Sequence, residues 1–278
     1  WNSYFYLQEA LKTQRPKVII LEAFAATRKE SYSDESRIIK NNFGIKFSKN
    51  KIESLKASTP QEKSDYLFEW IYYHNRYKEV NETDFGKYLG NKKKYKDWKG
   101  HYSMSETREF PMPMLKETIS LIPMPDKQKE YLRKIFELTL KERIPLVVIV
   151  SPYAGYSERE AGMYLDVQQI AKEYGIPFVN YNERYSELGL NFLTDCADKD
   201  HLNYLGSEKL SRSIGEYLIL NYDIEDRRGE TYYKTWERNA EYYYQYVDNI
   251  ELQKVIDLKT YLTIVSERDC GYIIAISK

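Results

Sequence analysis

Short, uninterrupted apolar runs alternate with longer amphipathic stretches over about the first 220 residues of this chain. The runs lie within residues 17–22, 146–150 and 176–180 and are rich in valine and isoleucine. A half-exposed strand alternates apolar and polar residues, but these runs do not alternate. They are typical of strands that are buried on both faces, as in a parallel sheet. We therefore expect three neighbouring or near-neighbouring parallel strands.

The amphipathic stretches predict helices that pack on this sheet. Their ranges are 3–14, 128–142, 163–174 and 205–220. In the second of these helices, four apolar residues at three- and four-residue spacing define the expected buried side: Leu132, Ile135, Phe136 and Leu140. Consecutive helix and strand units require right-handed crossovers. The pattern therefore predicts an α/β fold with a three-layer, doubly wound parallel sheet.

The pattern also divides the chain into regions. We expect one α/β domain over residues 1–222, with a helical insertion at about 25–115, where the alternation of strands and helices weakens. Residues 223–278 begin with a polar linker and continue with a helical pattern. A strand-like run at 271–277 has no obvious partner in the sequence, so we interpret this region as the start of a C-terminal appendage.

Composition limits the possible partners. The 42 basic and 42 acidic residues cancel, and no apolar run approaches the length of a membrane helix. Residues 86–100 combine lysines with aromatic rings, as single-stranded nucleic-acid platforms do. No nucleic-acid-binding motif accompanies them, so we interpret this stretch as a solvated loop or a lid and expect neither nucleic acid nor a spanned membrane. Cys196 and Cys270 lack metal-ligand spacing and are interpreted as free thiols.

The residues with the clearest chemical pattern are Asp198 and His201, which precede the amphipathic helix predicted at 205–220. A carboxylate three residues before a histidine, in a short turn, can accept the imidazole Nδ1–H and fix its tautomer. Nε2 is then available as a general base. The helix would tie this pair to the core of the domain.

Residues 198–203, followed by Gly206, resemble the last motif of the SGNH/GDSL hydrolases. Residues 16–22, 144–153 and 171–183 resemble the later strands and helices of bacterial envelope-associated members. The resemblance implies hydrolysis or transfer of an ester acyl group, often on a carbohydrate or cell-envelope polymer, without a cofactor. It also implies an extracellular or cell-envelope location and a triad in which Asp198 and His201 assist a serine.

One part of the family pattern is absent from this sequence. The nucleophile of the family lies in a Gly-Asp-Ser or Gly-Ser-Ser block after the first strand, and neither block occurs here. We therefore expect the serine and the first strand to lie outside the 278 residues, so that this chain alone is nearly inactive and its sheet has a gap or an exposed edge.

Three further residues are second-rank candidates. Glu22 and Ser151 each end a predicted strand, where doubly wound sheets place their sites. Ser151 precedes a proline, so its position is explained equally well as a simple strand end. His74 lies beside an aromatic stripe of a helix predicted at 66–80, where a packed histidine is the more ordinary interpretation.

Two alternatives to acyl transfer remain open at this point. Asp195, Asp198, Asp200 and His201 lie close together in the sequence, as metal ligands sometimes do. A zinc site would need more imidazole or thiolate ligands, so we expect no metal. The other alternative is a non-catalytic domain that binds a glycan or a protein on a hydrolase scaffold. The 28 tyrosines could stack on sugars, although compositional bias explains them equally well.

Overall fold

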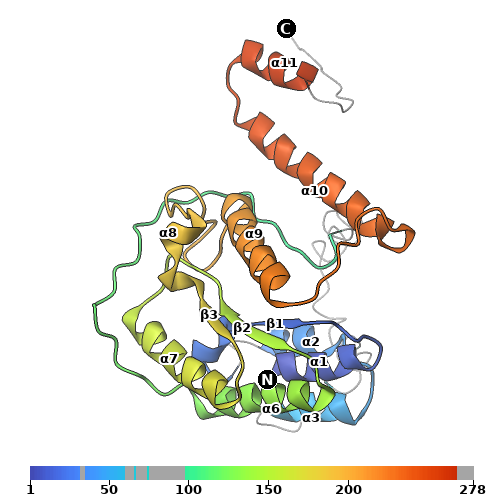
Figure 1. Cartoon of the computed structure of the whole chain (residues 1–278), viewed down its shortest axis with the longest axis vertical. Coiled ribbons are helices and arrows are strands. Elements are labelled where there is room, and N and C mark those ends of the chain that lie inside the picture. Colours follow the sequence, from blue (N-terminus) through green and yellow to red (C-terminus); the bar gives the residue numbers. More distant parts are fainter. Residues whose placement is uncertain (32–34, 60–65, 67–73, 75–97, 268–278) are drawn as a thin grey trace. The chain divides into compact units, whose positions relative to one another are not determined.

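A computed structural model describes residues 1–31, 35–59, 66, 74 and 98–267 of the chain (Figure 1). The chain divides into two compact units. The first comprises Trp1–Gly86 and Glu106–Ile224, and the second comprises Lys87–Ser105 and Glu225–Lys278. The strand predicted at 271–277 lies outside the described residues, as does most of the helix predicted at 66–80.

Three parallel strands form the sheet of the first unit. They are β1 (Ile19–Glu22), β2 (Leu146–Val150) and β3 (Phe178–Asn180), and β2 lies between the other two. Ile19 pairs with Leu146, and Val148 pairs with Phe178. The prediction of three parallel strands is therefore confirmed. Pro177 lacks an N–H, and β3 begins directly after it.

The predicted helices of this unit also form, with bounds within three residues of those expected, except that α7 begins five residues earlier. They are α1 (Asn2–Leu11), α6 (Asp126–Glu142), α7 (Glu158–Glu173) and α9 (Tyr204–Asn221). The shorter elements of the unit are η1 (Phe24–Thr27), α2 (Glu35–Asn42), α3 (Lys49–Ser58), η4 (Tyr181–Glu183) and α8 (Tyr185–Leu188). After α7 the chain turns at Gly175, whose φ of 65° is readily adopted only by glycine.

Alternate residues of β2 belong to two different hydrophobic clusters. Val148 and its even-numbered neighbours pack with residues of α6 and α7, whereas Val147 and Ile149 pack with Leu210 of α9. Figure 1 shows α6 and α7 on one side of the strands and α9 on the other. Every residue of β2 is buried, as the uninterrupted apolar run predicted. Burying a side chain of this size contributes roughly 1.5–3 kcal/mol, so both clusters stabilise the strand. The first unit is thus a mixed α/β structure with a small parallel sheet.

One predicted core residue is not in the core. Leu140 of α6 is 53% exposed, whereas Thr139 is buried beside Phe136. The prediction that Leu140 faces the core is wrong. A step of four residues advances the side chain by about 40° beyond a full turn of the helix, so the buried stripe passes from Leu132 and Phe136 to Thr139 rather than Leu140.

The second unit contains helices and an aromatic cluster. Its described elements are η5 (Thr231–Tyr233), α10 (Lys234–Gln253) and α11 (Leu258–Glu267). The ring of Trp98 lies 5.7 Å from that of Tyr243 and 4.8 Å from that of Tyr246, both on α10. Within the described part of both units, no helix is both long enough and apolar enough to cross a bilayer.

Candidate functional site

Buried polar residues hold both ends of the loop that carries Asp198 and His201. Asp195 is 1% exposed, and its carboxylate accepts hydrogen bonds from Lys209 Nζ at 2.7 Å, Asn191 N at 2.8 Å and Thr194 Oγ1 at 2.8 Å. Asn203 is fully buried and donates Nδ2–H to the carbonyl of Thr194 at 2.7 Å. Because buried polar groups are costly when unpaired, these contacts favour one arrangement of the loop.

Asn203 also begins α9, as the sequence predicted. Its side-chain oxygen accepts the N–H groups of Leu205 at 3.0 Å and Gly206 at 3.2 Å. A Cβ at Gly206 would lie 2.4 Å from the carbonyl oxygen of Asp195. The close approach of the loop to the helix therefore requires glycine at position 206.

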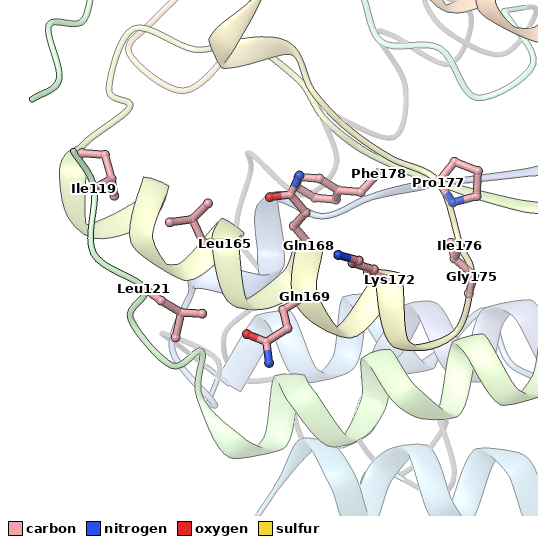
Figure 2. A pocket seen from close by; sticks show the side chains of 10 residues that line it. All are labelled: Ile119, Leu121, Leu165, Gln168, Gln169, Lys172, Gly175, Ile176, Pro177 and Phe178. Carbon is pink, nitrogen blue, oxygen red and sulfur yellow. The ribbon is translucent and has the colours of Figure 1, made fainter. Parts of the chain in front are cut away.

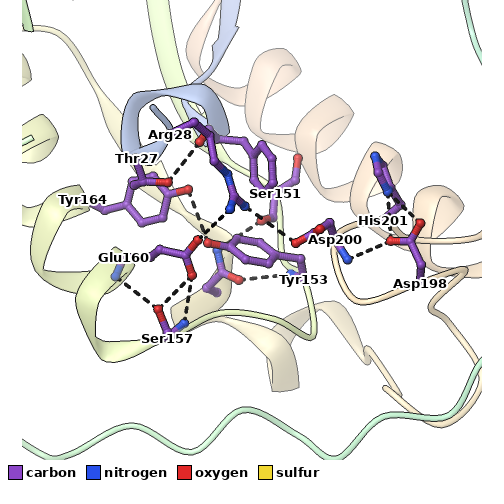
Figure 3. Close-up of polar contacts among 12 residues, drawn as sticks. Thr27, Arg28, Ser151, Tyr153, Ser157, Glu160, Tyr164, Asp198, Asp200 and His201 are labelled. Atoms are coloured by element: carbon purple, nitrogen blue, oxygen red, sulfur yellow. Dashed lines mark hydrogen bonds and ion pairs between the residues drawn. The ribbon is translucent and has the colours of Figure 1, made fainter. Parts of the chain in front are cut away.

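The structure brings Asp198 and His201 together. His201 Nδ1 lies 2.9 Å from Asp198 Oδ1 and 3.0 Å from Oδ2 (Figure 3). The prediction that the two residues lie within hydrogen-bond reach is confirmed. When Nδ1–H donates to the carboxylate, Nε2 of the neutral ring is left as an acceptor. The His201 side chain is 61% exposed, so solvent or a ligand can approach the ring.

The electrostatic surroundings of Asp198 favour a carboxylate. Burial raises the pKa of Asp198, but hydrogen bonds from the Asp200 N–H and from His201 lower it, and the net change is downward. The Asp200 N–H donates to Asp198 Oδ1 at 2.8 Å. Asp198 is consequently ionised at neutral pH and can stabilise positive charge on the imidazole.

Glu22 and Ser151, two second-rank candidates, contact each other at the carboxyl ends of β1 and β2. Glu22 Oε2 accepts hydrogen bonds from both the N–H of Ser151, at 3.0 Å, and its hydroxyl. Glu22 Oε1 accepts the N–H of Phe24 at 3.0 Å. Although part of the Glu22 side chain reaches solvent, burial of the carboxylate raises its pKa, and these donors oppose the rise. The hydroxyl proton of Ser151 is thus directed to Glu22.

His74, the third candidate, is exposed to solvent. The residues on both sides of it lie outside the described part of the chain. Its assignment as a candidate therefore stays a prediction.

Arg28 is a site residue that the sequence did not indicate. Its guanidinium lies between two acids, with Nη1 3.3 Å from Glu160 Oε1 and Nη2 3.6 Å from Asp200 Oδ1 (Figure 3). Its Cζ also lies 3.9 Å from the centre of the Phe24 ring. Arg28 falls within the expected insertion, where no periodicity distinguished it. Only Glu160 carried a signal, as the last residue of a Ser-x-x-Glu capping box that starts at Ser157.

Three buried tyrosines lie near these acids: Tyr153, Tyr156 and Tyr164. Burial raises the pKa of Tyr156 and Tyr164 to about 12 and also raises that of Tyr153, so their hydroxyls are neutral at physiological pH. The Tyr153 ring packs edge-on against Phe24 at 5.1 Å. The sequence indicated only an excess of tyrosine, because local spacing does not reveal which rings converge in space.

Two further observations concern ligands. Within the described residues, no three or more His, Cys, Asp or Glu side chains gather as a metal ion would need. An open groove of about 960 Å³ lies beside α7 and the start of β3 (Figure 2). Ten residues line it: Ile119, Leu121, Leu165, Gln168, Gln169, Lys172, Gly175, Ile176, Pro177 and Phe178. Asp198 and His201 are not among them.

Comparisons of this chain with protein-family models, with curated proteins and with solved structures found no match. The functional interpretation therefore rests on the residues, on their geometry and on the resemblance of the motif at residues 198–203.

Proposed function

We propose that this chain is part of an SGNH-type ester hydrolase or acyltransferase that acts on an acylated carbohydrate or cell-envelope polymer. His201 is the general base and Asp198 orients it. The observation that carries this proposal is the contact of His201 Nδ1 with both carboxylate oxygens of Asp198, at 2.9 and 3.0 Å. The resemblance of residues 198–203 to the last motif of the SGNH/GDSL hydrolases also leads us to propose a location outside the cell or in its envelope.

In the proposed reaction, Nε2 of His201 takes the proton of a serine hydroxyl while the serine oxygen attacks the carbonyl carbon of the ester. The tetrahedral intermediate then breaks its bond to the leaving alkoxide, which receives the proton from the imidazolium. Water or an acceptor hydroxyl removes the acyl group by the same steps. General base catalysis contributes roughly 10²–10⁴ to such a rate. Asp198 holds the ring and stabilises its positive charge.

The serine of this mechanism lies, in our proposal, outside these 278 residues. Ser151 does not fit a mechanism in which His201 is the base, because its hydroxyl donates to Glu22 and not to the imidazole. Apolar packing on alternate sides of β2 supports the proposed three-layer, doubly wound arrangement. Ile20 of β1, which is 39% exposed at the edge of the described sheet, is where we propose that the first strands of the family pair.

The test is hydrolysis of an aryl acetate by the intact protein and by its His201→Ala variant. The variant should lose the activity. His101→Gln is the matched control, because His101 lies in the second unit, where its ring contacts Tyr243 at 5.3 Å. An intact protein that is inert toward every ester tried would contradict the proposal.

A second function, glycan binding without catalysis, is favoured by one observation. Two aromatic side chains of the second unit are exposed, Tyr232 at 85% and Trp236 at 56%. Their apolar faces could stack on sugar rings. Retention of the intact protein on cell-wall glycan, together with loss of retention in Trp236→Ala and no esterase activity, would support this function instead.

A further inference from the structure

Arg28 connects the loop of Asp198 and His201 to the first turn of α7. In α7, the residue that contacts Arg28 is Glu160, and the capping box of this helix fixes its side chain. Glu160 is buried, and its Oε2 accepts the N–H of Ser157 at 3.2 Å and the hydroxyl at 2.9 Å. Glu160 Oε1 lies 3.3 Å from Arg28 Nη1. A carboxylate held in this way gives the guanidinium a rigid partner.

The backbone and the guanidinium of Arg28 are also fixed. Gln128 of α6 donates Nε2–H to the carbonyl of Arg28 at 2.8 Å and to that of Lys29 at 2.9 Å. The guanidinium lies 3.9 Å from the centre of the Phe24 ring. Contacts with α6, with α7 and with η1 therefore hold Arg28, in addition to its contact with the loop.

In the loop, the residue that contacts Arg28 is Asp200. Nη2 of Arg28 is 3.6 Å from Asp200 Oδ1. Nη2 and Nε are buried, and neither has a hydrogen-bond acceptor among the described residues. A buried donor without an acceptor is costly, so the approach of the Asp200 carboxylate to Arg28 is favourable. The ion pair between Arg28 and Asp200 therefore stabilises this position of the loop.

Asp200 links Arg28 to Asp198, which contacts His201. Its carboxylate faces Arg28, while its N–H donates to Asp198 Oδ1 at 2.8 Å (Figure 3). The carbonyl of the preceding residue, Lys199, accepts the N–H of Gly155 at 2.7 Å, which fixes the loop at a second point. Any movement of Asp200 therefore changes the hydrogen bonding of the carboxylate that orients His201.

We propose that Arg28 is a positioning residue. By holding Asp200, it keeps the Asp198 carboxylate in place to accept Nδ1–H and so selects the imidazole tautomer in which Nε2 is the base. The catalytic meaning of this role rests on the proposed function. The structural effect does not, because it can be measured in protein that has no esterase activity.

The test is the tautomer of His201 in the neutral ring, read from ¹⁵N chemical shifts in the 278-residue chain labelled at histidine. The wild-type chain should hold mainly the Nδ1–H tautomer. Arg28→Gln should raise the fraction of the Nε2–H tautomer several-fold, and Arg28→Lys should restore part of the difference, because one ammonium replaces a fork that reaches two acids. Asp200→Asn should match Arg28→Gln, and combining the two substitutions should add little.

Lys116→Gln is the matched control. Lys116 pairs with Glu158 at 2.8 Å in the same first turn of α7, but its side chain is 74% exposed. This substitution removes a cation without touching the loop, so the tautomer should not change. A folded Arg28→Gln chain with the wild-type tautomer would overturn the inference. If that variant does not fold, Asp200→Asn and Arg28→Lys decide the question by the same measurement.

Activity separates this inference from the proposed function. In an active intact protein, Arg28→Gln should lower kcat by about tenfold with little change in KM, because the orientation of the base matters most in the transition state. If the tautomer changes but no ester is hydrolysed, the positioning role stands and the proposed function fails. If His201→Ala abolishes activity while Arg28→Gln changes neither the tautomer nor kcat, only the positioning role fails.

Discussion

Asp198 and Glu22, two carboxylates of the first unit, both accept hydrogen bonds, but their surroundings change their pKa values in opposite directions. Asp198 lies in a loop, where the N–H of Asp200 and the ring of His201 overcome burial and lower its pKa. Glu22 lies at the end of β1, where burial raises its pKa despite donors from Ser151 and Phe24. Because its pKa is lowered, Asp198 stays ionised beside His201 and can stabilise an imidazolium, whereas the donors to Glu22 come from Ser151 and Phe24. The comparison favours Asp198, rather than Glu22, as the acid that supports a base.

The largest expected effect is a loss of turnover on substitution of Asp198 in the loop. In the intact protein, Asp198→Asn should lower turnover of an aryl acetate by up to about 10⁴ with little change in KM, because an amide favours the wrong imidazole tautomer. Glu22→Gln is the parallel change in the other pair and should have a far smaller effect on kcat. Equal losses in the two variants would show that the pairs do not differ in function.

The next largest expected effect is on the free energy of unfolding, through the close contact between the loop and α9. Gly206→Ala should destabilise the chain by about 1–3 kcal/mol, because its Cβ would lie 2.4 Å from the carbonyl oxygen of Asp195, which belongs to the backbone and cannot rotate away. The measurement is the midpoint and slope of urea unfolding.

Gly215 provides a control in the same helix. The structure places no heavy atom of the described residues within 4 Å of a Cβ built there. Gly215→Ala should therefore stabilise α9 by about 0.8–1 kcal/mol through helix propensity alone. If both alanine variants change stability in the same direction, the close approach of the loop to α9 is not what requires glycine at 206.

The two carboxylates should also give opposite dependences of stability on pH. Asp198 has a lowered pKa in the folded chain, so its stabilising contribution is complete above the ordinary value of 3.8 and is lost as the pH falls through the lowered value. Glu22 has a raised pKa, so it starts to destabilise the fold as the pH rises above its ordinary value of 4.5 and does so fully above the raised value.

Urea unfolding between about pH 3 and pH 7 measures both contributions. The difference in unfolding free energy between wild type and Asp198→Asn should grow as the pH rises toward 3.8 and should level off above it. The difference between wild type and Glu22→Gln should shift against the wild type above pH 4.5. Parallel slopes would contradict the assigned directions of the two pKa changes.

The sequence predicted much of the fold because the relevant signals are local. The uninterrupted run at 146–150 indicated a buried strand, and the three-residue spacing of Asp198 and His201 allowed their contact within one turn. The contact of Arg28 with Glu160 was not predictable in this way, because it depends on how η1 packs against α7, and Asp200 is likewise distant from Arg28 in the sequence. The same is true of Glu22 and Ser151, which meet only because β1 and β2 are neighbours in register.

The smallest expected effect tests the strand-end pair directly. Ser151→Ala removes the hydroxyl that donates to Glu22 Oε2 but leaves the Ser151 N–H bond to the same oxygen. Loss of one such hydrogen bond should cost about 0.5–1.5 kcal/mol in urea unfolding, and it should raise the pKa of Glu22 further, because a donor that favours the charged form is gone. In the Glu22→Gln background the Ser151→Ala substitution should cost less, since the acceptor is then uncharged. A different outcome would reassign the nucleophile: if the 278-residue chain by itself hydrolyses aryl acetates and Ser151→Ala abolishes that activity, the serine of the mechanism is Ser151, and the pair at the strand ends belongs to the catalytic machinery.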